Sequence, residues 1–149
     1  MMTPVYRIQL VKDKSVAYRA TINNASDAVS VARKLLEGSD RERVVAVMLD
    51  VRNQVIGATE VSVGTVSASL VHPREAFKAA ILLNASALIL AHNHPSGELS
   101  PSAHDEALTT RLVECGKLLG IEVLDHVIVA GGAWMGLRES HPELWRGKR

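Results

Sequence analysis

Two histidines one residue apart, His92 and His94, close an apolar run and constrain the fold of this chain more than any other feature. Side chains alternate along an extended strand with a period of two, so both imidazoles point to the same side and can reach one ion. A third candidate ligand, Asp105, follows a Pro-Ser-Gly turn and lies in a new helix. Two imidazoles and a carboxylate would form the open three-ligand sphere of a catalytic zinc, with the fourth position left for water.

The phase of that helix places Asp105 on the buried side. One face carries residues at helical spacing, namely Asp105, Leu108, Leu112, Cys115 and Leu119. An ionised carboxylate that points inward is costly unless it is paired or bound to a cation. No lysine or arginine occupies the adjacent positions of this face, so a metal held with the two histidines resolves the problem.

Ser102 lies one helical turn before Asp105, where its hydroxyl can face the open position of the metal. The same two residues also fit a capping box, in which a serine is followed three residues later by an acid. Ser100 before Pro101 already makes a good N-cap, which predicts a helix from Pro101 to about Leu119 and leaves Ser102 for another role.

The remaining patterns predict an α/β (α+β) chain with a mixed sheet flanked by helices. The hydrophobic fraction is 47% but the aromatic fraction is only 3%, so the core must consist of aliphatic side chains, as in buried strands. Periodicity predicts strands at 5–11, 44–50, 55–63, 87–91, 121–129 and 133–137, and helices at 26–37, from 73 and from 101.

Charge and cysteine content exclude several classes of protein. The chain has 17 Lys and Arg against 16 Asp and Glu, a net charge of +1, which provides no broad basic field for a nucleic acid. The single cysteine, Cys115, excludes an internal disulfide and a cysteine-rich zinc cluster. The amino terminus lacks a signal-peptide pattern and no apolar stretch is long enough to span a membrane, so we expect a cytoplasmic protein.

The order His92-x-His94, seven residues, Ser102, two residues, Asp105 resembles the signature of the JAMM (MPN+) metalloproteases. The flanking Ala-His-Asn-His-Pro-Ser-Gly, Val-His-Pro-Arg-Glu and Leu-Gly-Ile-Glu-Val-Leu-Asp-His resemble the RadC branch of that superfamily, over about residues 41–132. The resemblance implies a JAB/MPN (cytidine-deaminase-like) fold. It also implies a zinc hydrolase that cleaves peptide or isopeptide bonds, with a peptide or a ubiquitin-like protein as substrate.

By the same resemblance His92, His94 and Asp105 would bind Zn²⁺ together with a water, and Ser102 would hydrogen-bond the oxyanion. The family also needs a glutamate just before a central strand as general base, which here is Glu42. Glu60 and Glu98 are rivals for that role. Asp125 and His126 also match the RadC sequence motif, and we expect them to form a hydrogen bond behind the metal or to pack in the core. His72, His104 and His141 are interpreted as non-ligands.

RadC proteins usually carry an N-terminal helix-hairpin-helix region, and the first forty residues show no glycine-centred hairpin. We therefore expect residues 1–40 to be a strand-helix extension packed on the domain, 41–137 the JAB/MPN-type catalytic domain and 138–149 a surface tail. The alternative function is a DNA-processing accessory or protein-interaction module with a mainly structural metal. An iron oxygenase fits the order of ligands poorly, and a cytidine deaminase would need a Cys-x-x-Cys pair.

Overall fold

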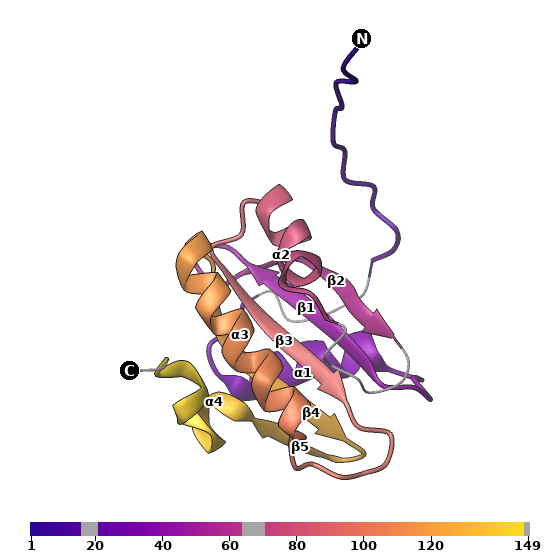
Figure 1. Cartoon of the computed structure of the whole chain (residues 1–149). Helices are drawn as coiled ribbons and strands as arrows, with labels where there is room; N and C mark the ends of the chain where they lie inside the picture. The colour runs from indigo at the N-terminus through magenta and orange to yellow at the C-terminus, as the bar shows by residue number, and fades with distance from the viewer. Residues whose placement is uncertain (16–20, 64–70, 148–149) are drawn as a thin grey trace.

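A five-stranded mixed sheet forms the centre of the molecule (Figure 1). The computed structural model describes residues 1–15, 21–63 and 71–147. The strand order is β2-β1-β3-β4-β5, and every neighbouring pair is antiparallel except β3 and β4, which are parallel. The strands are β1 (Arg43–Leu49), β2 (Val55–Val63), β3 (Ala87–Asn93), β4 (Glu122–Ala130) and β5 (Ala133–Gly136).

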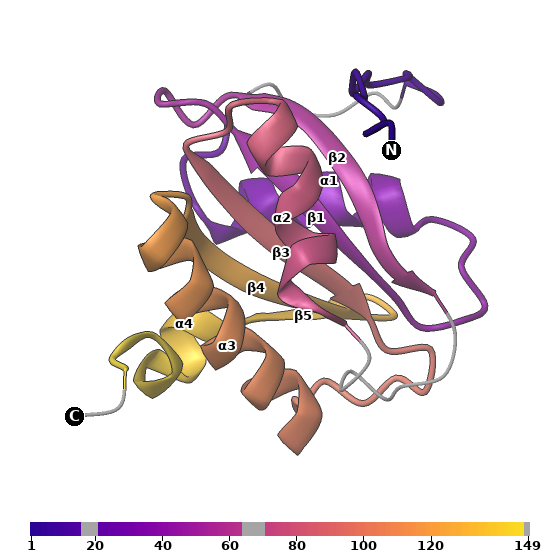
Figure 2. The same ribbon diagram turned by 45° about the horizontal axis from the view of Figure 1, so that its top comes forward.

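Helices cover both faces of this sheet (Figures 1 and 2). Helix α1 (Ala25–Leu36) lies on one face, and helices α2 (Pro73–Leu82) and α3 (Ala103–Leu119) lie on the other. Each interface encloses its own group of buried aliphatic side chains, with Phe77 the one aromatic ring among them. The predicted α+β arrangement, with a mixed sheet between helices, is therefore confirmed, and it is the fold of a JAB/MPN domain.

The two central strands bring distant parts of the chain to one edge of the sheet. Strands β1 and β3 are aliphatic runs buried on both faces, as expected for interior strands. They run antiparallel, with Val44 opposite His92. The start of β1 therefore meets the end of β3, and the residue just before β1 lies beside the two histidines.

Three expectations about secondary structure, two of them near the ends of the chain, differ from the structure. The segment 5–11 alternates like a strand, but residues 1–15 have no regular structure and exposed side chains, because no described strand pairs with them. Helix α3 begins at Ala103 rather than Pro101. Part of the expected surface tail folds back as α4 (Leu137–Ser140) and the short 3-10 helix η2 (Pro142–Trp145), and η2 buries Leu144.

Within the described part of the chain, no helix combines the length and apolar character needed to cross a bilayer.

Candidate metal centre

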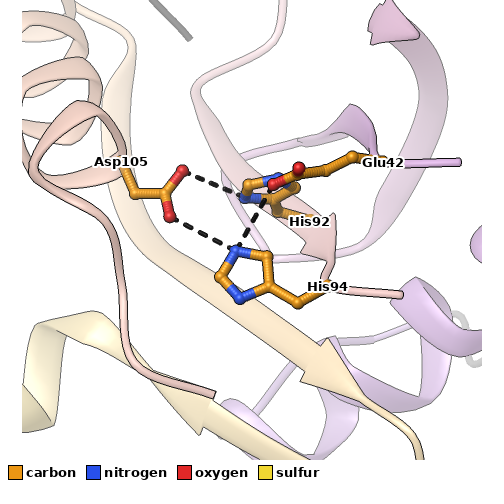
Figure 3. Close-up of side chains that lie close together, drawn as sticks. All are labelled: Glu42, His92, His94 and Asp105. Carbon is orange, nitrogen blue, oxygen red and sulfur yellow. Dashed lines mark ion pairs between the residues drawn. The ribbon is translucent and has the colours of Figure 1, made fainter. Parts of the chain in front are cut away.

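Four side chains converge at the edge of the sheet where β3 ends (Figure 3). His92 and His94 come from β3 and the loop after it, Asp105 comes from the first turn of α3, and Glu42 precedes β1. Each offers one ligand atom, and these four atoms all lie within 4.8 Å of one another. The structure therefore brings together the three predicted ligands and the predicted glutamate.

The two imidazoles are held in different ways. His92 belongs to β3 itself and is buried. His94 follows the strand, and its Nδ1 lies 2.6 Å from the carbonyl oxygen of Glu98. Since a carbonyl can only accept, Nδ1 of His94 carries the proton and Nε2 faces the other three side chains. Gly97, with φ of 84°, allows the tight turn that brings Glu98 back to this ring.

Asp105 is fully buried, as its helical phase predicts. Its Oδ2 accepts a hydrogen bond from the backbone of Ser102 at 2.8 Å and lies 3.3 Å from Nε2 of His94, and its Oδ1 lies 3.4 Å from Nδ1 of His92. Burial opposes ionisation, but the bonds from His94 and Ser102 and the charge of His92 hold the pKa of Asp105 well below its usual range. The carboxylate is thus ionised and ready to bind a cation.

Ser102, and not Ser100, is the N-cap of α3. Its Oγ accepts a hydrogen bond from the Asp105 backbone at 3.0 Å, and the Asp105 side chain bonds back to the Ser102 backbone, which completes a capping box. The sequence-based choice of Ser100 was wrong, because the cap depends on the partner three residues later. Capping uses a lone pair of the Ser102 hydroxyl and leaves its O–H available to donate. The cap is therefore compatible with the predicted oxyanion contact, which stays a prediction.

Glu42 is the acid that reaches the histidines. Its Oε1 contacts Nε2 of His92 and lies 3.5 Å from Nε2 of His94. Burial raises the pKa of Glu42; the charge of His94 opposes this shift, and the charge of Asp105 adds to it. Glu60 instead pairs with Arg43 at 2.5 Å on the exposed side of β2, and the Glu98 side chain is exposed on the loop. Geometry thus separates Glu42 from its two rivals, while its role as general base stays a prediction.

Unpartnered polar atoms indicate that this cluster fits a metal ion. Four buried side-chain atoms of the described residues have no hydrogen-bond partner. Three belong to the cluster, Glu42 Oε1, His92 Nδ1 and Asp105 Oδ1, and the fourth is Nε2 of His126. Native proteins satisfy nearly all buried polar atoms, so three such atoms in one place call for a ligand. Imidazole nitrogens and carboxylate oxygens are donors that divalent zinc accepts. The residues present therefore fit a metal.

His126 lies directly behind the cluster. It is fully buried, and its ring centroid lies 5.9 Å from that of His92. The Thr109 hydroxyl donates its one proton to the Asp105 carbonyl at 2.7 Å and also lies 2.7 Å from His126 Nδ1. Nδ1 of His126 must therefore carry the proton in that contact. His126 thus links β4 to the helix turn that presents Asp105. It forms a hydrogen bond behind the cluster and is also packed in the core, which are the two roles expected for it.

The other histidines lie outside the cluster. His72 caps α2 by accepting a hydrogen bond from the Arg74 backbone, and His141 lies 3.7 Å from Glu106. His104, next to Asp105, is exposed. None of the three belongs to the group of converging side chains. Asp125, next to His126, bonds instead to the backbone of Arg138 and of His126 itself.

A hollow of about 570 Å³ opens beside His94 on the α1 side of the sheet. Its walls are the second half of α1, with Arg33 and Lys34, and the loops that follow β3 and β4, with Pro95 and Gly131. Ligand pockets commonly have a volume of this order and are mainly apolar with a few polar groups. The metal cluster thus has an adjoining surface large enough for part of a substrate.

The two buried histidines predict that acid destabilises the metal-free protein. Burial lowers the pKa of His92 to about 4 and that of His126 to about 3. An unfolded chain protonates both near pH 6.5, so between pH 6.5 and 4 the unfolded state binds more protons and the free energy of unfolding falls with pH. By pH 4 each histidine should contribute a loss of roughly 3 kcal/mol, part of it offset by the raised pKa of Glu42.

Urea unfolding in EDTA at pH 6.5 and pH 4 measures this loss. The raised pKa of His94, from its bond to Asp105, acts above this interval and does not change the sign. His126→Gln should remove about half of the difference between the two pH values. Equal free energies of unfolding at both values would contradict neutral, buried histidines.

Comparison with known proteins places most of the chain in one family. Residues 22–142 match the family model described as RadC-like JAB domain. A UPF0758 protein of Rubrobacter xylanophilus is 48% identical over 128 residues, which cover 84% of this chain and 56% of that protein. Those of Moorella thermoacetica and Methanococcoides burtonii are 48% and 43% identical, over 81% and 79% of this chain and 53% and 52% of theirs. The chain spans about half the length of these curated relatives.

Proposed function

Since the chain belongs to the RadC-like JAB domain family, we propose that it is a zinc-dependent hydrolase of the JAMM type that cleaves peptide or isopeptide bonds. The JAB/MPN superfamily includes metallohydrolases. The observation that supports the proposal most strongly is the buried cluster of two imidazoles and two carboxylates, three of whose polar atoms have no hydrogen-bond partner among the described residues.

His92, His94 and Asp105 would hold the metal, and Glu42 and Ser102 would act on the substrate. Zinc, when bound, would lower the pKa of a coordinated water to about 7 and polarise the substrate carbonyl. Glu42 accepts the proton of the attacking water and returns it to the leaving amine, a task that suits a carboxylate whose pKa burial has raised. Ser102 donates its hydroxyl proton to the oxygen that becomes negative as the amide carbon turns tetrahedral.

The hollow beside His94 would receive the chain on one side of the scissile bond. Its lining includes His94 of the cluster, and its α1 wall carries two cations, Arg33 and Lys34, and one acid, Glu37. Arg33 is itself held by the carbonyl oxygens of Gly131 and Ala133. A flexible peptide, such as the tail of a ubiquitin-like protein, is the substrate class that we propose, with a cytoplasmic location. The balanced charge of the chain gives nucleic acid no comparable support.

Metal analysis combined with an amide cleavage assay tests the proposal. Purified protein should contain one zinc per chain, and the zinc-loaded protein should release amine from at least one member of a panel of peptide and isopeptide substrates. Removal of zinc by a chelator should stop the release, and its addition should restore it. Stoichiometric zinc without cleavage of any member of the panel would contradict a hydrolase.

One observation favours the alternative of a structural metal in an interaction module. Glu42 approaches both histidines, so the cluster contains four donors, and a structural zinc normally has four protein ligands. The two functions differ in what Glu42 contributes. A fourth ligand should be needed for metal affinity, whereas a general base should be needed only for turnover.

Ser102→Ala should lower turnover by about 10²- to 10³-fold and leave zinc affinity unchanged, since it removes one donor to the oxyanion. The same change removes the α3 N-cap and should cost about 1 kcal/mol of stability. Asn24→Ala is the matched control, because Asn24 caps α1 in the same way, by accepting a hydrogen bond from Asp27. Steady-state kinetics and urea unfolding should show equal stability losses for both variants and a turnover loss for Ser102→Ala alone.

A further inference from the structure

Asn93 lies between the two histidine ligands in sequence, and its side chain points away from them, as alternation along a strand requires. It is nevertheless buried, and both its amide oxygen and its amide nitrogen are hydrogen-bonded. Its Oδ1 accepts a bond from the Arg43 backbone at 2.7 Å, and its Nδ2 donates to the Arg41 carbonyl at 2.8 Å. The two residues that it contacts are the immediate neighbours of Glu42.

These bonds extend the sheet by one step. Backbone pairing between β1 and β3 ends at Val44 and His92. One residue further, the Asn93 amide takes over by offering one acceptor and one donor to the chain that enters β1. Among side chains of this length only asparagine offers both. An N–H on one side and a carbonyl on the other also determine which way the amide is turned.

From this contact pattern we infer that Asn93 is the positioning residue of Glu42, which it ties to the strand that carries the metal ligands. The peptide units on both sides of Glu42 are bonded to one side chain, so the carboxylate has only its own rotamers left to vary. The Arg43 guanidinium holds the same segment from the other direction, through the Leu35 carbonyl, the Ser39 hydroxyl and Glu60. Among the described hydrogen bonds of Arg41 and Arg43, the two bonds to Asn93 are those that connect this segment to the ligand strand.

A positioning role and plain structural support predict different effects when the Asn93 side chain is removed. Without the Asn93 side chain, β3 still pairs with β1 and β4, and His92, His94 and Asp105 keep their own supports. What is released is the segment that presents Glu42. Metal affinity should therefore persist while the contact between Glu42 and His92 weakens.

A spectroscopic test reads that contact in the metal-free protein and needs no turnover. In protein labelled with ¹⁵N in the histidine rings, Glu42→Ala should shift the Nε2 resonance of His92, the atom that Glu42 contacts. Asn93→Ala should shift it in the same direction. The matched control is Asp50→Ala, because Asp50 accepts bonds from the Arg52 and Gln54 backbone at the opposite end of β1; it should leave the resonance in place.

A kinetic test uses the zinc-loaded protein and rests on the proposed function. Asn93→Ala should lower kcat by about 10- to 100-fold with zinc affinity within about twofold. In a Glu42→Gln background the same change should have no further effect, because the group that Asn93 positions is already lost. Asn93→Leu keeps the approximate size of the side chain but forms neither bond. It should behave like Asn93→Ala, which would show that the loss of kcat does not come from an empty space left by the smaller side chain.

Two results would overturn the inference: a His92 resonance that moves in Glu42→Ala but not in Asn93→Ala, or an equal loss of kcat from Asn93→Ala with and without the Glu42 carboxylate. A wild-type protein that cleaves no amide would refute the proposed hydrolase, and the resonance comparison would still decide whether Asn93 positions Glu42.

Discussion

Asp105→Ala should abolish stoichiometric zinc binding and reduce amide cleavage to background. The change removes a fully buried carboxylate and leaves only two imidazoles among the three proposed ligands. Loss of a group that merely supports a ligand already costs 10- to 100-fold in metal affinity, so loss of a ligand should cost more than about 100-fold. Isothermal titration of the metal-free protein with zinc measures this directly.

Asp105 also caps its own helix, so two controls separate the two roles. Asp105→Asn keeps an oxygen that can accept from the Ser102 backbone but lacks the negative charge, and it should fold normally and still lose zinc. Glu106→Ala removes the next acid of the same helical turn, which is only half-buried, and should keep wild-type affinity. Wild-type zinc affinity in either Asp105 variant would remove the basis of the proposed function.

Glu42→Gln should lower turnover by about 10²- to 10⁴-fold, the usual contribution of a general base, while the protein keeps its zinc. Glutamine has the shape of glutamate but cannot take up a proton. Because Glu42 can accept a proton only as a carboxylate, wild-type turnover should decline on the acid side as this group becomes protonated, and this decline should be absent from the residual activity of the variant.

Glu60→Gln is the matched control, because it removes the rival acid on β2 together with its exposed ion pair to Arg43. Exposed ion pairs contribute little, so its turnover should stay near that of the wild type. Full turnover in Glu42→Gln would refute the assignment of the base. A large loss of zinc affinity in the same variant would favour Glu42 as a fourth ligand, and with it the structural metal.

The sequence was most informative where a local period sets the geometry. Alternation placed His92 and His94 on one side of a strand, and helical phase buried Asp105, because both depend only on backbone spacing. The start of α3 was misplaced by two residues because Ser100 and Ser102 both fit a cap locally. The bond between Ser102 and the Asp105 backbone decides between them.

Long-range contacts were harder to predict from residues alone. Glu42 reaches the histidines because Val44 pairs with His92 in an antiparallel register, which no short pattern near Glu42 encodes; the family resemblance supplied it. The alternating segment 5–11 has no described partner strand, so its pattern did not produce one. The bonds of Asn93 to Arg41 and Arg43 were not predicted, because they also depend on the pairing of β1 with β3.

The centre is divided between two distant segments of the chain, and this division has an evolutionary consequence. All three proposed ligands lie in the single segment His92–Asp105, and the carboxylate proposed as base lies far away in sequence, just before β1. One substitution at position 42 could silence chemistry while fold and ion persist. If the proposed roles hold, proteins that descend from such a chain would keep the fold and the metal site after the catalytic activity had been lost.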